Sequence, residues 1–396
     1  MRLAARFNKK ADQRKAGLKD IFKRMAATID RSAPLVWVHA ASLGEFEQGR
    51  PVIEAIRAEH PGYKIMLTFF SPSGYEVRKN YTGADYVFYL PIDTPYNARR
   101  FVQIARPEIA IFIKYEFWLN YLRQLSKAKC RIFLVSAIFR DEQIFFKWWA
   151  GTFRKGLRLF EWLFVQNMAS RLLLDTIGIH NTTATGDTRF DRVAAVAGAA
   201  RRIQAVEKFA AGARVMVAGS TWPPDEHIIM EMVRRHPELK FVIVPHEIVE
   251  ERIEGMITRS ARPVVRYTEC DGGKDPSGYE VMIVDVIGIL SSVYQYASYA
   301  YIGGGFGVGI HNTLEAAAFG IPVAFGPNYH RFREACDLIA TGAGVSVESA
   351  DELDEWLTQM EQDRPQYEDR CELSRCYVSQ NMGATRKILE HIFPVG

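Results

Sequence analysis

A glycine-rich stretch late in the chain has the residue pattern best suited to holding a phosphate. Five of the seven residues from 303 to 309 are glycine: Gly303, Gly304, Gly305, Gly307 and Gly309. Glycine accepts positive φ and lets the backbone approach a ligand closely. A helix predicted over 313–319 follows, so free N–H groups and the helix dipole are expected to converge on an anion. A tight strand–helix turn with no ligand fits the same pattern.

Three polar residues follow the glycines, and they help to decide between a dinucleotide site and a nucleotide-sugar site. His311 comes first, and Asn312 and Glu315 stand three positions apart on one face of the predicted helix. A dinucleotide-binding glycine loop normally follows the first strand of its domain, whereas this loop lies late in the chain. The pattern therefore favours a nucleotide-sugar site, with the glycine loop at the phosphate.

Two glutamates follow predicted strands in the first half and could perform acid–base chemistry. Glu45 ends the segment Ser42-Leu43-Gly44-Glu45 after the apolar run 35–40, and Glu116 follows the run 109–113. An acid in a first helical turn gains about 0.3–1 kcal/mol, which is a sufficient structural reason for Glu45. The functional interpretation is a general base that stays ionised at neutral pH and deprotonates an acceptor hydroxyl. Paired carboxylates also suit glycoside hydrolysis, although the nucleotide-like loop disfavours it.

Polar residues also follow predicted strands in the second half. Ser220 and Thr221 come after the run 215–219, and His246 follows the run 241–245. They could line a sugar or phosphate, and His246 could equally be a turn histidine that is satisfied locally. The sequence contains no Asp-x-Asp pair and no His/Cys cluster, so we predict neither a metal nor another cofactor.

Apolar runs alternate with helical segments, which predicts an α/β protein of two doubly wound, Rossmann-like halves facing a cleft. The runs lie at 35–40, 64–70, 86–90, 109–113, 131–135, 163–166 and 181–186, then at 215–219, 241–245, 281–284, 299–302 and 323–325. A helix is also predicted over 377–393. We expect a basic N-terminal segment (1–30), an N-terminal domain (31–195), a linker (196–212), a C-terminal domain (213–375) and a C-terminal helix (376–396) that could return to the first domain.

Composition indicates a globular protein with reduced thiols. Of the 396 residues, 48% are hydrophobic and 24% charged, and the net charge is +4. The five cysteines are scattered and form neither a zinc set nor a disulfide framework, which suits a cytosolic protein. No apolar run approaches the roughly 20 residues of a membrane span, and no secretory signal is visible.

Two basic stretches raise the question of a charged partner. The first 24 residues hold nine Lys or Arg against two Asp, and residues 145–164 interleave aromatic and basic side chains shortly after Arg140. Such stretches can be solvated or buried helices with snorkelling bases, and the second also fits nucleic acid. Because both suit an anionic lipid surface, we favour lipid and expect no nucleic acid.

Taken in order, these segments resemble the 3-deoxy-D-manno-octulosonic acid (Kdo) transferase family over about residues 36–391. The family's Ser-x-Gly-Glu motif stands at 42–45, and its His-Asn-x-x-Glu segment closes the glycine-rich stretch. Each motif alone is weak, whereas their order and spacing together are specific. The other matching segments are 91–95, Arg100-Phe101, 116–120, 186–191 and Gly326-Pro327 with Phe332.

The resemblance implies a GT-B glycosyltransferase of lipopolysaccharide biosynthesis. It implies inverting, metal-independent transfer of Kdo from CMP-Kdo to a lipid A precursor (lipid IVA), with CMP-Kdo a substrate and no cofactor. Glu45 would be the catalytic base, in an acceptor-binding N-terminal domain with Ser42, Gly44, Glu116 and Arg140 at the acceptor site. The C-terminal domain would hold the donor's CMP through Ser220, Thr221, His246, Gly304, Gly305, Gly307, Gly309, His311, Asn312 and Glu315.

The chain departs from the family pattern at two positions. Pro245-His246 stands where the family often has Arg-His, and Trp222 stands where a histidine usually follows Gly-Ser-Thr. The family commonly has an N-terminal membrane anchor. We therefore expect the cytoplasmic face of the inner membrane, reached peripherally or through an anchor absent from this sequence. The alternatives are a GT-B enzyme with a UDP-sugar donor and a non-enzymatic membrane-surface protein that binds nucleotide sugars.

Overall fold

The computed structural model describes residues 2–394, and residues 2–9 by their backbone only. The chain divides into two compact units: unit 1 contains the residues through Arg192 and those from Asn381 onward, and unit 2 is Val193–Gln380. Met1 and residues 395–396, at the outer ends of the predicted segments 1–30 and 376–396, lie outside the described residues. The cleft expected between the two units stays a prediction.

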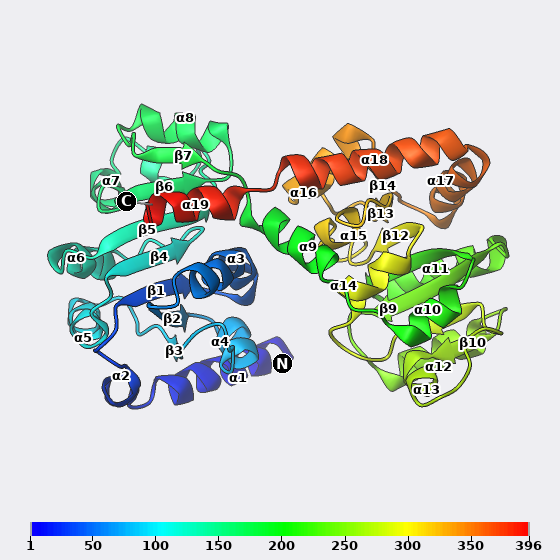
Figure 1. Ribbon diagram of the computed structural model, residues 1–396, viewed down its shortest axis with the longest axis horizontal. Helices are drawn as coiled ribbons and strands as arrows, with labels where there is room; N and C mark the ends of the chain where they lie inside the picture. The colour runs from blue at the N-terminus through cyan, green and yellow to red at the C-terminus, as the bar shows by residue number, and fades with distance from the viewer. Residues whose placement is uncertain (1, 395–396) are drawn as a thin grey trace. The chain divides into compact units, whose positions relative to one another are not determined.

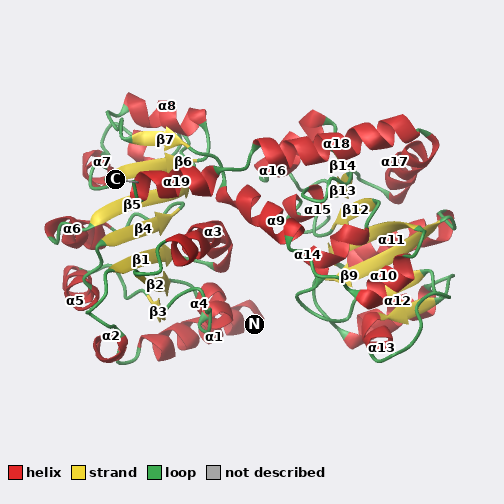
Figure 2. Ribbon diagram, viewed as in Figure 1, coloured by secondary structure: helices red, strands yellow, loops and turns green. Residues whose placement is uncertain are grey.

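Unit 1 is built on a parallel sheet covered by helices on both faces (Figures 1 and 2). Its seven described strands run in the order β3-β2-β1-β4-β5-β6-β7. They are β1 (Leu35–Ala40), β2 (Lys64–Phe69), β3 (Tyr86–Tyr89), β4 (Ile109–Ile113), β5 (Arg131–Ala137), β6 (Trp162–Val165) and β7 (Thr182–Ala184). Its helices are α1 (Arg2–Leu18), α2 (Ile21–Thr28), α3 (Leu43–Glu59), α4 (Pro72–Arg78), α5 (Pro95–Ala105), α6 (Leu119–Lys127), η1 (Ile144–Phe146), α7 (Gly151–Leu157), α8 (Met168–Thr176) and α19 (Ala384–Ile392), with α9 (Thr188–Gly198) leading into unit 2.

Unit 2 repeats the architecture with a second parallel sheet. Its seven described strands run in the order β10-β11-β9-β8-β12-β13-β14. They are β8 (Arg214–Thr221), β9 (Leu239–Pro245), β10 (Val264–Arg266), β11 (Val281–Ile283), β12 (Tyr299–Ile302), β13 (Val323–Phe325) and β14 (Gly344–Ser346). Its helices are α10 (Gln204–Ala210), α11 (Pro223–Arg235), α12 (Glu250–Arg259), α13 (Tyr267–Asp271), α14 (Leu290–Val293), η2 (Tyr294–Tyr296), α15 (Leu314–Ala317), α16 (Arg333–Thr341), α17 (Ala350–Gln362) and α18 (Arg364–Gln380).

Strand β1 shows why its residues form a central strand. All six of its side chains are buried, and successive residues point to opposite faces of the sheet. Trp37 packs into the layer under α5 and α6, while Val36 and Val38 pack into the layer under α3 and α19. A run that is apolar at every position suits a strand with both faces covered, as in a parallel sheet. The predicted doubly wound fold is thus confirmed.

The elements differ from the prediction at the sheet edge and at helix ends. Strands β10 and β14 were not predicted, because each has three residues and lies at an edge of the sheet. The helix predicted over 377–393 is broken between α18 and α19 at Gly383, whose φ is +96°. The helix predicted over 313–319 is only α15, four residues long. The helical linker region is interrupted between α9 and α10.

Candidate functional site

Glu45 lies at the carboxyl end of β1, in the first turn of α3. Ser42 is the N-cap residue of this helix in extended conformation, but its side chain makes no capping bond. The carboxylate of Glu45 instead turns back over the strand–helix turn, where Oε2 accepts the backbone N–H of Ala41 at 2.5 Å. The carboxylate is therefore held in one place by the turn that presents it.

The surroundings of Glu45 raise the pKa of its carboxyl group to about 7. Burial is the main cause and the charge of Glu116 the next, while the Ala41 N–H, Lys114 and the Ser42 N–H act in the opposite direction. The expectation that Glu45 is fully ionised at neutral pH is therefore wrong. A carboxyl group with a pKa near the working pH is, however, well matched to general base catalysis.

Glu116 is anchored by a hydrogen-bond network that begins inside the sheet. Its Oε2 accepts the indole N–H of Trp118 and lies 3.2 Å from Nε2 of His39. His39 is completely buried in β1, and its Nδ1 is 2.8 Å from Oγ1 of Thr68. The structure thus brings the two predicted acids, Glu45 and Glu116, to one edge of the sheet. His39 was missed, and its signal was a histidine within an apolar strand.

The other predicted acceptor residues differ in their surroundings. A Cβ placed on Gly44 would have no atom within 4 Å, so nothing in the protein requires glycine there. Arg140 is exposed, and its backbone makes two hydrogen bonds with Gln143: its N–H donates to Oε1 of Gln143 at 3.2 Å, and its carbonyl accepts the N–H of Gln143 at 3.1 Å. No contact within the described residues links Arg140 to Glu45.

The glycine loop follows β12 in unit 2, and four of its glycines have structural causes. A Cβ on Gly303 would lie 2.3 Å from the carbonyl oxygen of Ser220, and one on Gly305 would lie 2.5 Å from Cα of Gly326. Gly304 and Gly309 have φ of +93° and +143°. Gly303 and Gly305 thus let the β12 loop pack against the backbone of the β8 and β13 loops, whereas at Gly307 the nearest atom would be 3.6 Å away.

Several N–H groups of this loop are used inside the protein. Those of Gly307 and Gly309 donate to the carbonyl of Gly304, at 3.0 and 3.3 Å. The N–H of Gly304 donates to Asp225 at 2.9 Å. The expected convergence of N–H groups and a long helix dipole on a phosphate is thus reduced, because these donors are occupied and α15 has a single turn.

Asp225 is the residue that joins the glycine loop to the start of α11. Its side chain is completely buried, and Oδ2 accepts the N–H groups of Trp222 and Gly304, both at 2.9 Å. Oδ1 accepts the hydroxyl of Tyr301 at 2.9 Å. Burial raises the pKa of the carboxyl group against these three hydrogen bonds. Asp225 was missed in the sequence, because an acid in a first helical turn is ordinary.

Three aromatic rings gather at the carboxyl ends of β8, β9 and β12. His246 stacks on Trp222 with ring centroids 4.8 Å apart and on His311 at 4.3 Å. The indole Nε1–H of Trp222 donates to Nε2 of His311 at 3.0 Å. Burial and then the neighbouring His246 lower the pKa of His311 to about 4. Two predicted donor residues therefore meet at Trp222, which the sequence marked only as a departure from the family pattern.

The remaining predicted donor residues are a pair that follows the glycine loop and two residues at the end of β8. Asn312 Nδ2 donates to Oε1 of Glu315 at 3.0 Å, so this predicted pair is in contact. Thr221 is fully buried, and its hydroxyl donates inward to Glu226 at 3.3 Å. Ser220 stands at the end of β8 with φ of +55°, a left-handed conformation that is strained for a non-glycine residue.

Arg331 is a further residue that the sequence reasoning did not select. It is exposed, and its guanidinium donates to the carbonyl oxygen of Val308 in the glycine loop. It lies in the loop between β13 and α16. A cation fixed beside this loop can neutralise a phosphate, and its signal was its position after a strand end.

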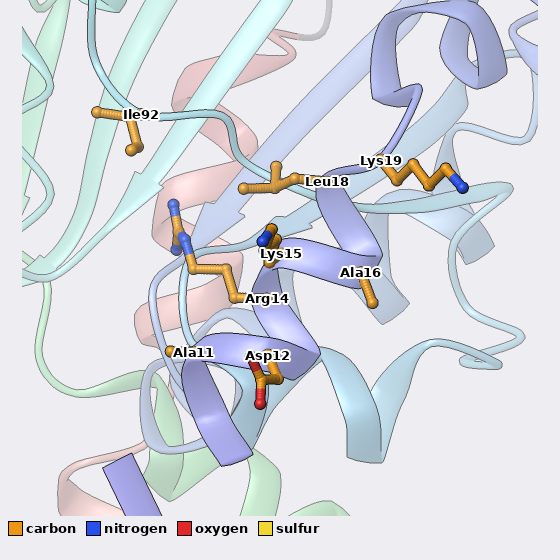
Figure 3. Close-up of a pocket in the computed structure, with 8 residues that line it drawn as sticks. All are labelled: Ala11, Asp12, Arg14, Lys15, Ala16, Leu18, Lys19 and Ile92. Carbon is orange, nitrogen blue, oxygen red and sulfur yellow. The ribbon is translucent and has the colours of Figure 1, made fainter. Parts of the chain in front are cut away.

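A hollow in unit 1 is lined by α1 and by the loop that carries Ile92 (Figure 3). Arg14 crosses one side, where its guanidinium lies 3.5 Å from the centroid of the Phe70 ring and donates to the carbonyl oxygens of Phe70 and Leu90. Lys15 and Lys19 are exposed at the hollow. Because β2 and β3 end at Phe69 and Tyr89, the hollow adjoins the same sheet edge as Glu45.

Two classes of feature are absent from residues 2–394. No helix there is long and apolar enough to cross a membrane. The same residues contain no group of three or more His, Cys, Asp or Glu side chains that could hold a metal ion.

Solved structures share this architecture at low sequence identity. A UDP-GlcNAc 2-epimerase from Neisseria meningitidis, bound to UDP-GlcNAc, superposes with a TM-score of 0.64 at 16% identity, covering 91% of this chain and all of the other. Another UDP-N-acetylglucosamine 2-epimerase gives 0.60 at 12% identity, covering 92% of this chain and 97% of the other. At these identities the likeness shows the fold alone. The fold is of the GT-B type, with two Rossmann-like units.

Sequence comparison finds similarity to one family. Residues 5–192 match the family described as 3-deoxy-D-manno-octulosonic-acid transferase (kdotransferase). The 3-deoxy-D-manno-octulosonic acid transferase of Aquifex aeolicus is 28% identical, over 82% of this chain and 85% of that protein. That of Bordetella pertussis is 27% identical, over 90% of this chain and 87% of that protein.

Fold and sequence together define a glycosyltransferase of the GT-B type. The chain is similar to Kdo transferases over most of its length, in line with the predicted resemblance. This similarity supports an enzyme that transfers Kdo in lipopolysaccharide biosynthesis, from a nucleotide-sugar donor to a lipid acceptor.

Proposed function

We propose that the chain transfers Kdo from CMP-Kdo to a lipid A precursor such as lipid IVA, with inversion and without a metal. The observation that carries the proposal is Glu45, a partly buried carboxyl group fixed at the end of β1 with a pKa near 7. Such a group can exist as a carboxylate at neutral pH and accept a proton as the acceptor oxygen attacks.

The proposed step is a direct displacement. Glu45 takes the proton of an acceptor hydroxyl, whose oxygen forms a bond to the anomeric carbon of Kdo from the face opposite CMP. The bond between that carbon and the phosphate oxygen breaks, and CMP leaves as the anion. Because the donor carries one phosphate, less charge has to be neutralised than for a nucleoside diphosphate, so we propose that neither a metal nor a cofactor is required.

We place the leaving CMP at the carboxyl ends of the unit 2 strands. His246, His311, Asn312 and Glu315 gather there, with the exposed guanidinium of Arg331 beside the glycine loop. We assign the binding of CMP to these side chains more than to the loop N–H groups, because the N–H groups of Gly304, Gly307 and Gly309 are already paired. The choice of cytidine over uridine is supported by the similarity to Kdo transferases.

We place the lipid acceptor and the cytoplasmic face of the inner membrane next to the hollow at α1. Its lining combines apolar Leu18 and Ile92 with the cations Arg14, Lys15 and Lys19. Apolar and basic groups together suit the acyl chains and phosphates of an anionic lipid surface.

The donor and acceptor are tested by product mass. Incubation with CMP-Kdo and lipid IVA is expected to add Kdo to the lipid at the same rate in the presence of EDTA. UDP-sugars in place of CMP-Kdo are expected to give no product. Transfer from a UDP-sugar alone, loss of activity in EDTA, or cleavage of the lipid without nucleotide would each contradict the proposal.

The membrane contact is tested with vesicles that contain anionic phospholipid. Reversing two charges at the hollow, K15E with K19E, is expected to weaken vesicle binding by about tenfold or more. The double variant K127E with K129E, at the end of α6, changes the net charge equally and is the control. Equal weakening by both pairs would show that only net charge matters and would remove the hollow from the account.

A further inference from the structure

The hydrogen bond between Trp222 and His311 fixes which nitrogen of His311 carries the proton. The indole Nε1–H can only donate, and it points at Nε2 of His311 over 3.0 Å. Nε2 must therefore be the unprotonated nitrogen, and in a neutral imidazole the proton then resides on Nδ1. A protonated Nε2 would instead place two N–H groups against each other.

Neighbouring groups hold the two rings in this arrangement. His246 stacks on both Trp222 and His311, with interplanar angles of 28° and 25°, so it covers one side of the hydrogen-bonded pair. Asp225 binds the backbone N–H of Trp222 and that of Gly304, a glycine at which an added Cβ would lie 3.1 Å from the His311 ring. The indole and the imidazole are thus set by one buried carboxylate and one stacked ring.

The other nitrogen of His311 is left for a ligand. Among the described residues Nδ1 has no hydrogen-bond partner, although Nε2 has Trp222 and the backbone N–H binds Gly303. His311 is partly buried, and its Nδ1 is not among the fully enclosed atoms of the described residues, so a ligand can approach it. The lowered pKa of His311, near 4, keeps the ring neutral at physiological pH.

We propose that Trp222 is a positioning residue that locks His311 as the Nδ1–H tautomer, so that Nδ1 donates a hydrogen bond to an oxygen of the nucleotide-sugar donor. The tautomer follows from the unit 2 contacts alone, whereas the ligand rests on the proposed function. The effect is to give this site a neutral N–H donor of fixed direction in place of a titrating cation. It also gives the departure from the family pattern at residue 222 a chemical role.

The tautomer is tested by nitrogen NMR of protein labelled with ¹⁵N-histidine, with H311Q used to assign the His311 signals. In the wild type we expect an unprotonated Nε2 and a protonated Nδ1. W222F keeps a ring for His246 to stack on but removes the N–H, so protonated Nε2 is expected to become populated. Trp356, whose indole N–H has no hydrogen-bond partner within the described residues, provides the matched control W356F, expected to leave the signals unchanged.

Affinity for CMP, measured by calorimetry, tests the ligand part separately. W222F is expected to bind CMP about three- to tenfold more weakly, the range for one hydrogen bond, and W356F as the wild type. A protonated Nε2 in the wild type, or signals that W222F leaves unchanged, would overturn the tautomer. Unchanged CMP affinity in W222F would overturn the donated bond. Failure of the wild type to bind CMP would overturn the proposed donor, while the NMR result would still decide the tautomer.

Discussion

Glu45 shows how much of a catalytic group's character comes from its neighbours. Its place at the end of β1 was predictable from an apolar run followed by Ser-Leu-Gly-Glu. Its raised pKa was not predictable. The dipole of α3 alone would favour the carboxylate, whereas burial and the charge of Glu116 outweigh the effect of the dipole. Sequence spacing gives no information on burial, or on which acid from another strand end arrives nearby.

The rate of transfer should follow the ionisation of Glu45. A general base acts only as the carboxylate, so kcat is expected to rise with pH up to about pH 7 and then to level off. Because the charge of Glu116 helps raise this pKa, E116Q is expected to move the rise to lower pH. Steady-state assays from pH 5 to 9 measure both, and a wild-type profile that is flat below pH 7 would contradict the assignment.

The ionisation of Glu45 should also affect the stability of the folded protein, which is expected to fall as pH rises, whereas the rate rises. A carboxyl group whose folded pKa is raised from 4.5 to about 7 binds its proton more tightly in the folded state, so stability falls as pH rises between these values. E45Q should therefore be more stable than the wild type at pH 8, on the order of 1–3 kcal/mol, with the gain fading toward pH 5. Urea unfolding at the two pH values measures this, and a loss of stability at pH 8 would count against it.

The glycine loop after β12 owes much of its composition to packing inside unit 2. A phosphate loop was predicted from its composition, but Gly303 and Gly305 are needed because the β8, β12 and β13 loops approach each other closely, and Gly304 and Gly309 because of their positive φ. The groups that could face a ligand are instead side chains that follow three different strands. They lie together because β9, β8 and β12 are neighbours in the sheet. This convergence could not be read from the sequence, since residues 222, 246 and 311 are far apart in it.

Substitutions to alanine should distinguish glycines that packing requires from glycines that it does not. In G303A the new Cβ would lie 2.3 Å from the Ser220 carbonyl oxygen, and we expect unit 2 to lose at least about 2 kcal/mol. G307A meets nothing closer than 3.6 Å and should stay within about 0.5 kcal/mol of the wild type. Thermal or urea unfolding compares them, and equal stability of the two variants would contradict the packing argument.

At the scale of the whole molecule, the chain leaves unit 1 and returns to it. The division falls after Arg192 and again before Asn381, and α19 packs beside α3 over the unit 1 sheet (Figure 1). Asp191 in α9 caps the returning helix by accepting the N–H groups of Gly383 and Thr385, at 2.6 and 2.7 Å. The alternating apolar runs predicted the two sheets, whereas the break at Gly383 was hidden, because helix-forming residues continue on both sides of it.

The returning helix should be part of the core of unit 1. Ile388 is fully buried there, so I388D is expected to destabilise unit 1 by at least about 3 kcal/mol. L373D, on a partly exposed position of α18, is the control. Hydrogen exchange should show faster exchange over β4 and β5 in I388D, with β8 and β9 unchanged. Unaltered protection of β4 and β5 would contradict the packing of α19.

We propose Glu45 as the base in Kdo transfer, and single-turnover transfer from CMP-Kdo to lipid IVA measures that role. E45Q is expected to lower the rate by about 100- to 10,000-fold while CMP affinity stays that of the wild type. E47Q, on the same helix but paired with Arg78 and Arg50, is expected to transfer normally. A rate in E45Q within about threefold of the wild type would contradict the account.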